Sequence, residues 1–384
     1  MPEWIETVEV ALKIKPYAPT DASRWDAFVG SQPTASLCHT SGWQRVIEQT
    51  WKHRQHSLYA EHEGEISGVL PLFHVKGWFG SMLISTPNGV YGGAVANDAA
   101  SHQALIEAAK SLAVELNVDY LELRDAARPG CAVLPGCETR PSELLLSRGS
   151  CPEIPQAGGA AYPGELVQNL YVSFDRPIVN DEVELMRSFP RDVRRMIRLG
   201  EKHGLSSLFG REELLGEFYE LYAASVRRLG TPVFPKKMFA EFLRQFPDCA
   251  DILVIRDGLR TVASVMSFYF RETVMPYYSG ANPAYHRAGV NNFMYRELML
   301  RSAQRGFIRF DFGRSKLGTG ACEFKRGWRM TERVLPYKFF LVRADKMPNL
   351  NPTNPKFNLM IETWKRLPLW LTKLIGPKIV RNFP

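Results

Sequence analysis

Charged side chains gather in the second half of the chain, where an apolar segment meets a polar loop. Asp311 lies near the end of a strand predicted over residues 307–312, and Arg314 and Lys316 follow it. Ligand sites often collect at such junctions. A carboxylate there can orient a neighbouring cation or accept a proton from an amine, and the two cations can bind phosphate or carboxylate groups. A structural ion pair and solvated loop charges are the alternatives that these residues leave open.

A second polar group precedes a predicted helix and contains His286, Arg287, Asn291 and Asn292. The free N–H groups and the dipole at the start of a helix favour an anion. Histidine titrates near neutrality, so His286 is a candidate base, and His39 is a weaker candidate of the same kind. A capped helix start and histidines on a polar surface are the alternatives.

Arg194 and Arg195 belong to a basic run in which several members recur at helical spacing. The run consists of Arg187, Arg191, Arg194, Arg195, Arg198 and Lys202. Such a face can contact the phosphates of a lipid-linked sugar, a nucleotide or an RNA. Few aromatic residues interleave with it, which disfavours extensive contact with single-stranded RNA. A solvated basic face is the alternative.

The bulk composition fits a two-domain protein with a positive field. The 384 residues carry a formal charge of +8, which suits an anionic partner. The six cysteines are scattered without a metal-like spacing, so we expect no metal site and a reducing cytoplasm. The first residues lack the pattern of a signal peptide, and no apolar run approaches the roughly 18 residues that span a bilayer.

The elements that must position these residues occur twice in the same order. A hairpin with a Glu63-Gly64 turn, a helix over 101–116 and a strand over 120–124 form the first set. A hairpin with an Asp257-Gly258 turn, a helix over 292–305 and the strand over 307–312 form the second. The matched order predicts two similar α/β (α+β) domains in tandem, each a mixed sheet flanked by helices.

The repeat can be aligned residue by residue on the two matching strands. Leu121 and Leu123 fall opposite Ile308 and Phe310, and all four are predicted to face a core. The residues that alternate with them are predicted to face the other side. They are Glu122, Arg124, Arg309 and Asp311.

Changes in composition set the domain boundaries. Residues 125–164 are rich in proline and glycine, and short strands around 143–147 and 166–174 are predicted to complete the first sheet. We expect domains over 1–174 and 175–345, with the main site in the second. Residues 346–384 form an amphipathic helical tail that mixes tryptophan and leucine with lysine and arginine. Docking on the body and peripheral contact with the inner face of a membrane are both compatible with it.

The order of hairpin, strand, helix and strand resembles the acyl-CoA-dependent N-acetyltransferase fold (GNAT). In that family two adjacent strands splay apart, and the helix start between them faces an anionic cofactor. The family's pyrophosphate loop usually reads Arg/Gln-x-x-Gly-x-Gly/Ala, whereas Arg287 and Gly289 stand one residue too close for it. The corresponding loop of the first half, residues 91–98, has no basic residue.

Short motifs spread over nearly the whole chain resemble the FemAB-related proteins of the exosortase/PEP-CTERM-associated branch, with BioF2-like acyltransferase domains. The most specific is Asp311-Phe-Gly-Arg-Ser-Lys316. The others are Gly68-Val-Leu-Pro-Leu72, Tyr91-Gly92-Gly93, Glu122-Leu-Arg124, Gly230-Thr-Pro-Val-Phe234 and Phe324-Lys325-x-x-Trp328.

The resemblance implies an N-acyltransferase and assigns residues to it. Lys325 matches a lysine thought to assist the developing oxyanion, and the expected pocket also includes Tyr277 and Tyr278. The donor is acyl-CoA or aminoacyl-tRNA, so tRNA is a possible partner. The acceptor is an amine on a cell-envelope or exopolysaccharide precursor. The alternative is a non-catalytic component that binds a glycolipid or nucleotide sugar.

Overall fold

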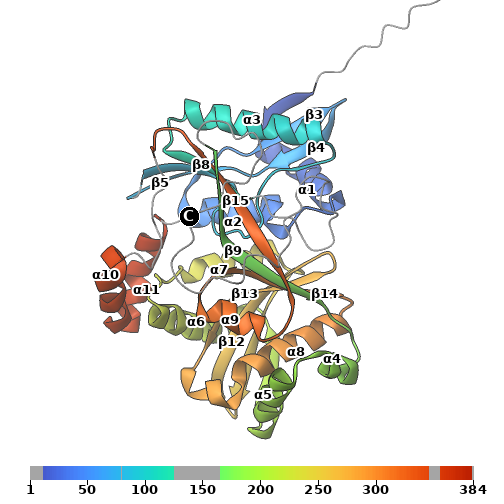
Figure 1. Ribbon diagram of the computed structural model, residues 1–384, viewed down its shortest axis with the longest axis vertical. Helices are drawn as coiled ribbons and strands as arrows, with labels where there is room; N and C mark the ends of the chain where they lie inside the picture. The colour runs from blue at the N-terminus through green and yellow to red at the C-terminus, as the bar shows by residue number, and fades with distance from the viewer. Residues whose placement is uncertain (1–11, 79, 125–164, 346–354, 383–384) are drawn as a thin grey trace, which may run out of the picture.

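The computed structural model describes residues 12–78, 80–124, 165–345 and 355–382. Within these ranges the strands form a smaller sheet, in the order β1-β3-β4-β7, and a long sheet, in the order β10-β11-β12-β13-β14-β9-β15-β8-β6-β5-β2. Helices cover both sheets, so the expected mixed α/β class is confirmed (Figure 1). The strand expected at 143–147 and Cys131, Cys137 and Cys151 lie outside the described residues.

The first half supplies the smaller sheet and one end of the long sheet. Its elements are β1 (Lys13–Pro16), η1 (Pro19–Asp21), α1 (Ala22–Ser31), η2 (Leu37–His39), α2 (Ser41–Trp51), β2 (Arg54–Gln55), β3 (Leu58–His62), β4 (Glu65–Leu70), β5 (Phe73–Gly77), β6 (Gly80–Ile84), β7 (Val95–Ala96), α3 (Ala99–Glu115), β8 (Tyr120–Leu123) and β9 (Glu165–Pro177).

The second half supplies the rest of the long sheet and the tail. Its elements are α4 (Glu182–Ser188), α5 (Arg191–Lys202), β10 (Ser206–Gly210), η3 (Glu212–Leu214), α6 (Leu215–Leu229), α7 (Lys236–Gln245), β11 (Ala250–Asp257), β12 (Arg260–Phe270), β13 (Thr273–Ala281), η4 (Pro283–Ala288), α8 (Val290–Gln304), β14 (Arg309–Lys316), α9 (Gly320–Arg326), β15 (Thr331–Leu341), α10 (Pro355–Arg366) and α11 (Leu369–Val380).

The two halves repeat one arrangement of strands. In the first, β5 runs antiparallel to β6, and β6 pairs in parallel with β8. In the second, β12 runs antiparallel to β13, and β13 pairs in parallel with β14. The connection between the parallel strands contains a helix in both halves, α3 in the first and α8 in the second. The predicted order of hairpin, helix and strand is therefore present in both halves. The two predicted hairpins differ in their sheet, because β3–β4 lie in the smaller sheet and β11–β12 lie in the long sheet with β14.

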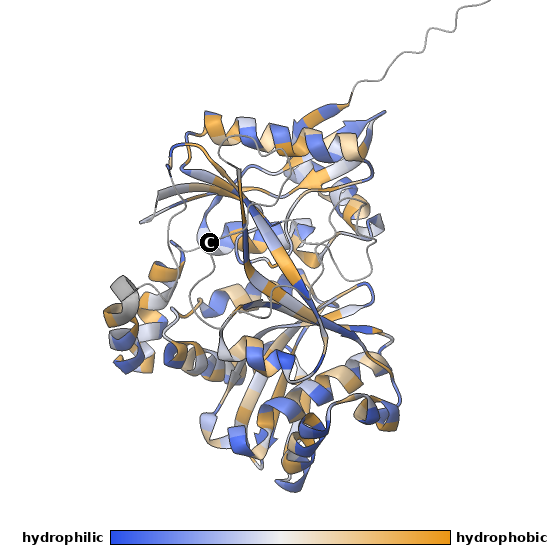
Figure 2. Ribbon diagram, in the orientation of Figure 1, coloured by the Kyte–Doolittle hydropathy of each residue, from blue (hydrophilic) through white to orange (hydrophobic). Residues whose placement is uncertain are grey.

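Alternating side chains explain how helices cover both faces of the second-half strands. Met266 and Phe268 of β12 pack into the cluster that contains α6, while Val265 packs into the cluster that contains α8. Helix α3 covers the first-half sheet, and hydrophilic and hydrophobic residues intersperse along it, as expected of an amphipathic surface helix (Figure 2).

The alignment of the matching strands is wrong by two residues. Ile308 is 53% exposed and lies outside β14, whereas Phe310 and Phe312 are buried. Leu121 and Leu123 are buried as predicted, so their counterparts are Phe310 and Phe312. The strand also continues to Lys316 instead of ending at residue 312.

Two long strands join the halves. β9, expected to complete the first sheet, lies between β14 and β15, and it continues past the expected boundary at Phe174 to Pro177. β15 pairs with β9 along one stretch and with β8 along another (Figure 1). The cores also merge, because Trp43 of α2 packs against Phe242 of α7 with ring centroids 4.7 Å apart.

The helices α10 and α11 dock on the body next to α6 (Figure 1). Trp364 is buried, and its Nε1 donates to the Thr231 carbonyl at 3.0 Å. Arg227 Nη1 donates to the Leu367 carbonyl at 2.8 Å. In the described part of the chain, no helix combines the length and the apolar content needed to cross a membrane.

Candidate active site

A cavity of about 660 Å³ opens where β13 and β14 splay apart. The strands pair only at Thr273↔Arg309 and Val274↔Phe310, and β14 then pairs with β9 alone. Main-chain and side-chain groups of both strands line the opening, together with residues from α6, η4, α8 and α9.

Most of the sequence-predicted site residues meet in this cavity. Those that line it are Tyr277, Tyr278, His286, Asn291, Arg314, Lys316 and Lys325. Those that do not are Asp311, Arg287, Asn292, Arg194 and Arg195. The predicted residues that line the cavity come together because each belongs to an element that borders the opening between β13 and β14.

A β-bulge in β14 opens the strands. The ladder with β9 shifts between Asp311 and Arg314, and Gly313 adopts a φ of 65°, a conformation that glycine tolerates. A bulge leaves main-chain groups without ladder partners. Asp311 Oδ1 accepts from the Gly313 N–H at 2.7 Å and so satisfies one of them.

Lys325 satisfies the carbonyl groups of the same bulge. Its Nζ donates to the carbonyls of Phe312, Gly313 and Arg314 at 2.7, 3.2 and 3.3 Å. Lys325 lies on the short helix α9, where Thr319 Oγ1 accepts from the Cys322 N–H. Burial lowers the pKa of its ammonium group to about 8, although the Asp311 carboxylate favours the charged form.

Asp311 faces the first half rather than the cavity. It is buried, and its Oδ2 accepts from Tyr91 Oη at 2.8 Å. The predicted proton acceptor is thus engaged by a main-chain N–H and a tyrosine hydroxyl. Together, Asp311 and Lys325 satisfy one main-chain N–H and three main-chain carbonyls of the bulge.

Arg314 extends between two tyrosines. Its guanidinium carbon lies 4.6 Å from the ring centroid of Tyr171 and 5.9 Å from that of Tyr337. Its Nη1 donates to Tyr337 Oη at 3.4 Å, and the other N–H groups of the guanidinium can bind an anion. Tyr337 Oη in turn donates to the Val90 carbonyl at 2.9 Å.

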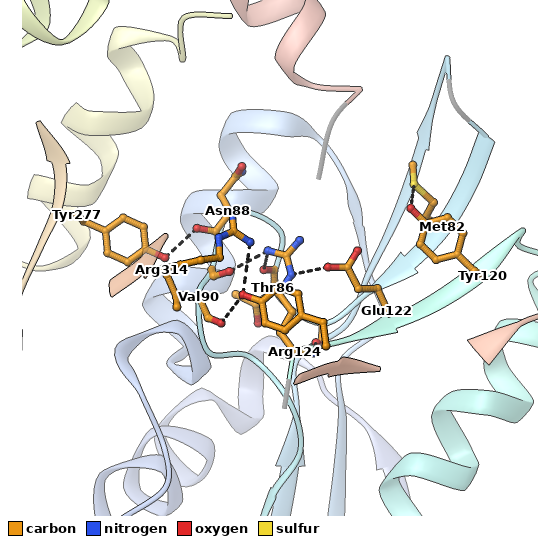
Figure 3. A network of polar contacts seen from close by, with 12 residues as sticks. Met82, Thr86, Asn88, Val90, Tyr120, Glu122, Arg124, Tyr277 and Arg314 are labelled. Carbon is orange, nitrogen blue, oxygen red and sulfur yellow. Dashed lines mark hydrogen bonds and ion pairs between the residues drawn. The ribbon is translucent and has the colours of Figure 1, made fainter. Parts of the chain in front are cut away.

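One wall of the cavity comes from the first half, which sequence reasoning missed. Asn88 and Val90 line the cavity, and the Asn88 carbonyl accepts from Tyr277 Oη at 2.9 Å (Figure 3). Residues 86–93 follow β6, so this loop occupies in the first half the place that η4 has in the second. The Tyr91-Gly92-Gly93 motif belongs to it and was the signal that could have revealed the wall.

In the first half, the ends of β6 and β8 stay joined by a buried polar network. Arg124 Nη1 donates to the carbonyls of Gly89 and Thr86 at 2.8 and 3.2 Å (Figure 3). Arg124 Nε donates to Glu122 Oε1 at 2.8 Å, and both side chains are buried. A buried ion pair therefore lies at the end of β8, the strand that corresponds to β14 of the second half.

The predicted anion loop at the start of α8 is only partly placed at the cavity. Asn291 lines it, whereas Arg287 is exposed elsewhere and Asn292 is buried. His286 stands at the rim, and burial followed by the charge of Arg228 lowers the pKa of its imidazole. A neutral imidazole can accept a proton.

The remaining sequence candidates lie away from the cavity. Arg194 Nη1 donates to the Phe189 carbonyl at 2.7 Å, and Arg195 is exposed on α5. His39 is buried with both ring nitrogens occupied, Nδ1 by the Ser36 N–H and Nε2 by the Gly93 carbonyl. These contacts give Arg194 and His39 structural roles.

The charges of the cavity have one sign. Arg228, Arg314, Lys316 and Lys325 line it, and no aspartate or glutamate does among the described residues. Burial raises the pKa of the Tyr277 and Tyr278 hydroxyls, which therefore stay neutral. A cavity with cations and neutral hydroxyls favours a ligand that carries negative charge.

Comparison with known proteins identifies the fold. Residues 187–326 match the family model of an acetyltransferase (GNAT) domain. No curated protein sequence matches the chain. The crystal structure of FemX superposes with a TM-score of 0.62 at 14% identity, covering 91% of this chain and 100% of that one. A conserved protein of unknown function from Bacteroides thetaiotaomicron superposes with a TM-score of 0.53 at 11% identity, covering 86% of this chain and 100% of that one.

The GNAT match spans the elements from the end of α4 to α9, and so includes β13, α8, β14 and the bulge. The likeness to FemX covers both halves. The chain therefore has a GNAT-type acyltransferase fold with the overall architecture of FemX.

Proposed function

We propose that this protein is an N-acyltransferase that moves an acyl or aminoacyl group from a phosphate-bearing donor to an amine. The observation that carries the proposal is the cationic cavity at the splayed strands of a GNAT-type fold. Two donors fit its charge, acyl-CoA and aminoacyl-tRNA, since both carry phosphates. The sequence motifs favour an acceptor amine on a cell-envelope or exopolysaccharide precursor made in the cytoplasm.

The reaction forms a bond from the amine nitrogen to the acyl carbon and breaks the bond from that carbon to the donor sulfur or oxygen. The amine loses a proton, and the leaving thiolate or alkoxide gains one. His286, neutral at the rim, accepts the proton in this proposal. Arg314 and Lys316 bind donor phosphates, and the acyl carbonyl lies over the bulge.

Lys325 contributes charge rather than a free hydrogen bond in this scheme. Its three N–H groups are already directed at main-chain carbonyls. In this scheme the Lys325 ammonium is a cation held in place beside the acyl carbon. It can stabilise the negative charge that develops on the acyl oxygen without having to move first. The same contacts hold the bulge open, so Lys325 also keeps the cavity in shape.

The experiment is a binding and turnover comparison on the full chain. Purified protein is screened by thermal shift against CoA, acyl-CoAs, UDP-sugars and charged tRNA, and the ligand that binds is then tested as a donor with amine acceptors. Stabilisation by a donor, followed by amide formation, supports the proposal. Stabilisation by UDP-sugars alone, without transfer from any donor, would favour the non-catalytic sugar-binding alternative.

We also propose that the chain divides into domains over residues 1–174 and 175–345. The second half supplies the splayed strands, and the first half supplies the 86–93 wall. We expect donor binding to depend on both halves for this reason.

A further inference from the structure

Helix α11 presents a stripe of side chains to solvent that starts apolar and ends cationic. Trp370 is 66% exposed and Leu374 is 62% exposed, and Lys378 and Arg381 are exposed beyond them. These four residues lie within one side of the helix at 100° per residue. We call them the tail stripe.

The opposite side of α11 fixes the stripe in this orientation. Thr372, Gly376 and Val380 are buried against the body. A Cβ added at Gly376 would lie 2.7 Å from the Val233 nitrogen, so the helix approaches the main chain closely. Lys373 forms an ion pair with Glu220 of α6. The stripe faces outward because its helix is anchored from behind.

The exposed surface continues onto the first half. Trp78, in the turn between β5 and β6, is 69% exposed, and its N–H donates to Asn382 Oδ1 at 3.3 Å. Lys76 is exposed beside it. Trp78 therefore borders the C-terminal end of the tail stripe, and Trp370 stands at its beginning. The two exposed tryptophans come from segments almost 300 residues apart in the sequence.

Helix α10, which docks beside α11, borders the cavity. Leu229, which lines the cavity, is 70% exposed at the end of α6. The next residue, Gly230, packs so closely on α10 that a Cβ there would lie 2.4 Å from Ile361 Cγ2. Helix α10 also exposes Leu359 and Met360. The mouth of the cavity thus opens beside the docked helices.

The charge balance of this region selects among occupants. Between residues 359 and 382 the cations are Lys365, Arg366, Lys373, Lys378 and Arg381, and the one acidic residue is Glu362, paired with Lys365. Tryptophan and leucine flanked by lysine and arginine fit the boundary between lipid headgroups and acyl chains. A protein partner of ordinary composition would not require this excess of cations.

We infer that the tail stripe, with Trp78, docks the protein on an anionic lipid bilayer and so places the mouth of the cavity beside the membrane surface. Apolar side chains enter the interface, and the cations contact lipid phosphates. Membrane binding needs no catalysis, so the inference stands or falls independently of the proposed acyltransferase activity. It also indicates that a lipid-anchored amine is the acceptor that reaches the cavity most readily.

The test is sedimentation of the full chain with vesicles of phosphatidylcholine alone and with vesicles containing phosphatidylglycerol. We expect binding to the anionic vesicles that weakens as salt rises. The double variant Trp370→Glu/Leu374→Glu should bind at least tenfold more weakly, and so should Lys378→Glu/Arg381→Glu. Leu259→Glu is the matched apolar control, because Leu259 is fully exposed in the distant β11–β12 turn.

A second control separates the stripe from net charge alone. The variant Arg198→Glu/Lys202→Glu changes the net charge by the same amount as Lys378→Glu/Arg381→Glu and should bind vesicles as the unmodified protein does. Equal loss from the α5 variant and the stripe variants would overturn the inference, as would equal binding to both vesicle types. Loss of self-association in Trp370→Glu/Leu374→Glu, measured by ultracentrifugation without lipid, would assign the surface to a second copy of the chain instead. Thermal melts confirm that each variant is folded.

Discussion

Lys325 and Asp311 matter because they satisfy the main-chain acceptors and a main-chain donor of one bulge. The acid accepts a main-chain N–H, and the lysine donates to three main-chain carbonyls. Two motifs that are separate in sequence, Asp311-Phe-Gly-Arg-Ser-Lys316 and Phe324-Lys325, thus act on the same few main-chain atoms. This arrangement explains chemically why the two motifs occur together.

Replacement of Lys325 by methionine should lower kcat about 100-fold, because the charge is lost. It should also reduce the stability of the fold, because the main-chain carbonyls of the bulge lose their hydrogen-bond donor. In the unmodified protein, the requirement for the Lys325 ammonium should appear as a decline of kcat above about pH 8, since its pKa is about 8 and lysine is charged below its pKa. The measurement is a pH profile of kcat for both proteins. Lys325→Arg, which stays charged, should lack the decline. For a purely structural lysine, the pH profiles of kcat for the unmodified protein and for Lys325→Arg would have the same shape.

The Arg124–Glu122 pair offers a stability prediction at the same scale. Arg124→Met should reduce the free energy of unfolding by about 3–5 kcal/mol, because it leaves the buried Glu122 carboxylate without a partner. Arg343→Met is the matched control, since Arg343 pairs with Asp119 near the surface and its loss should cost about 0–1 kcal/mol. Urea denaturation checks both. Similar midpoints for the two variants would contradict the buried pair's role.

At the scale of elements, the start of α8 depends on close packing against α5. Gly289 has a φ of 77°, and a Cβ there would lie 2.0 Å from the Met196 carbonyl oxygen. The approach is between two main chains, so no side-chain movement can relieve it. The glycine of the predicted anion loop therefore serves helix packing.

Gly289→Ala should destabilise the protein by about 4 kcal/mol or more, the range of mutations with a specific steric cause. Gly306→Ala provides the control, because Gly306 has a φ of 92° with nothing near its Cβ position and should cost only about 1–2 kcal/mol. Thermal or urea unfolding of the pair measures the difference. An equal cost would mean that backbone conformation alone, and not the contact with Met196, sets the requirement for glycine.

Sequence periodicity predicted the repeated elements well and their exact register poorly. Apolar alternation is the same at Ile308, Phe310 and Phe312, so the pattern cannot say which two of the three are buried. The polar groups around β13 and β14 predicted part of the cavity lining, including Tyr277, Arg314 and Lys316. The 86–93 wall could not be found in this way, because its contacts, such as Tyr91 with Asp311, join residues 220 apart.

At the scale of the molecule, the tail is part of the folded body. Trp364 and Val380 belong to the same buried cluster as Val233 and Tyr219. One face of these helices docks on the body, which supports the docking interpretation of the tail. The other face is exposed and can contact a membrane. The amphipathic sequence pattern was compatible with docking on the body and with membrane contact. It could not say which face of the tail helices would serve each role.

Removal of residues 350–384 should lower the melting temperature and increase aggregation. Burial of each large apolar side chain stabilises by roughly 1.5–3 kcal/mol, and the truncation exposes the surface that these side chains cover. Recovery in the supernatant and a thermal melt measure the effect. The full-length variant Trp370→Glu/Leu374→Glu is the control, since its exposed residues should leave the melt unchanged. An unaltered melt after truncation would show that the helices contribute nothing to the fold.

The pairing of β15 with both β8 and β9 has a consequence for how the chain is made. During synthesis, β8 emerges long before residues 331–341, so the first half has an open sheet edge for as long as the ribosome is translating the second half. An unpaired edge readily recruits other strands. Neither half can complete its sheet alone, and the first half reaches its final form only when nearly the whole polypeptide is available. Separate expression of residues 1–174 should accordingly give an aggregating fragment.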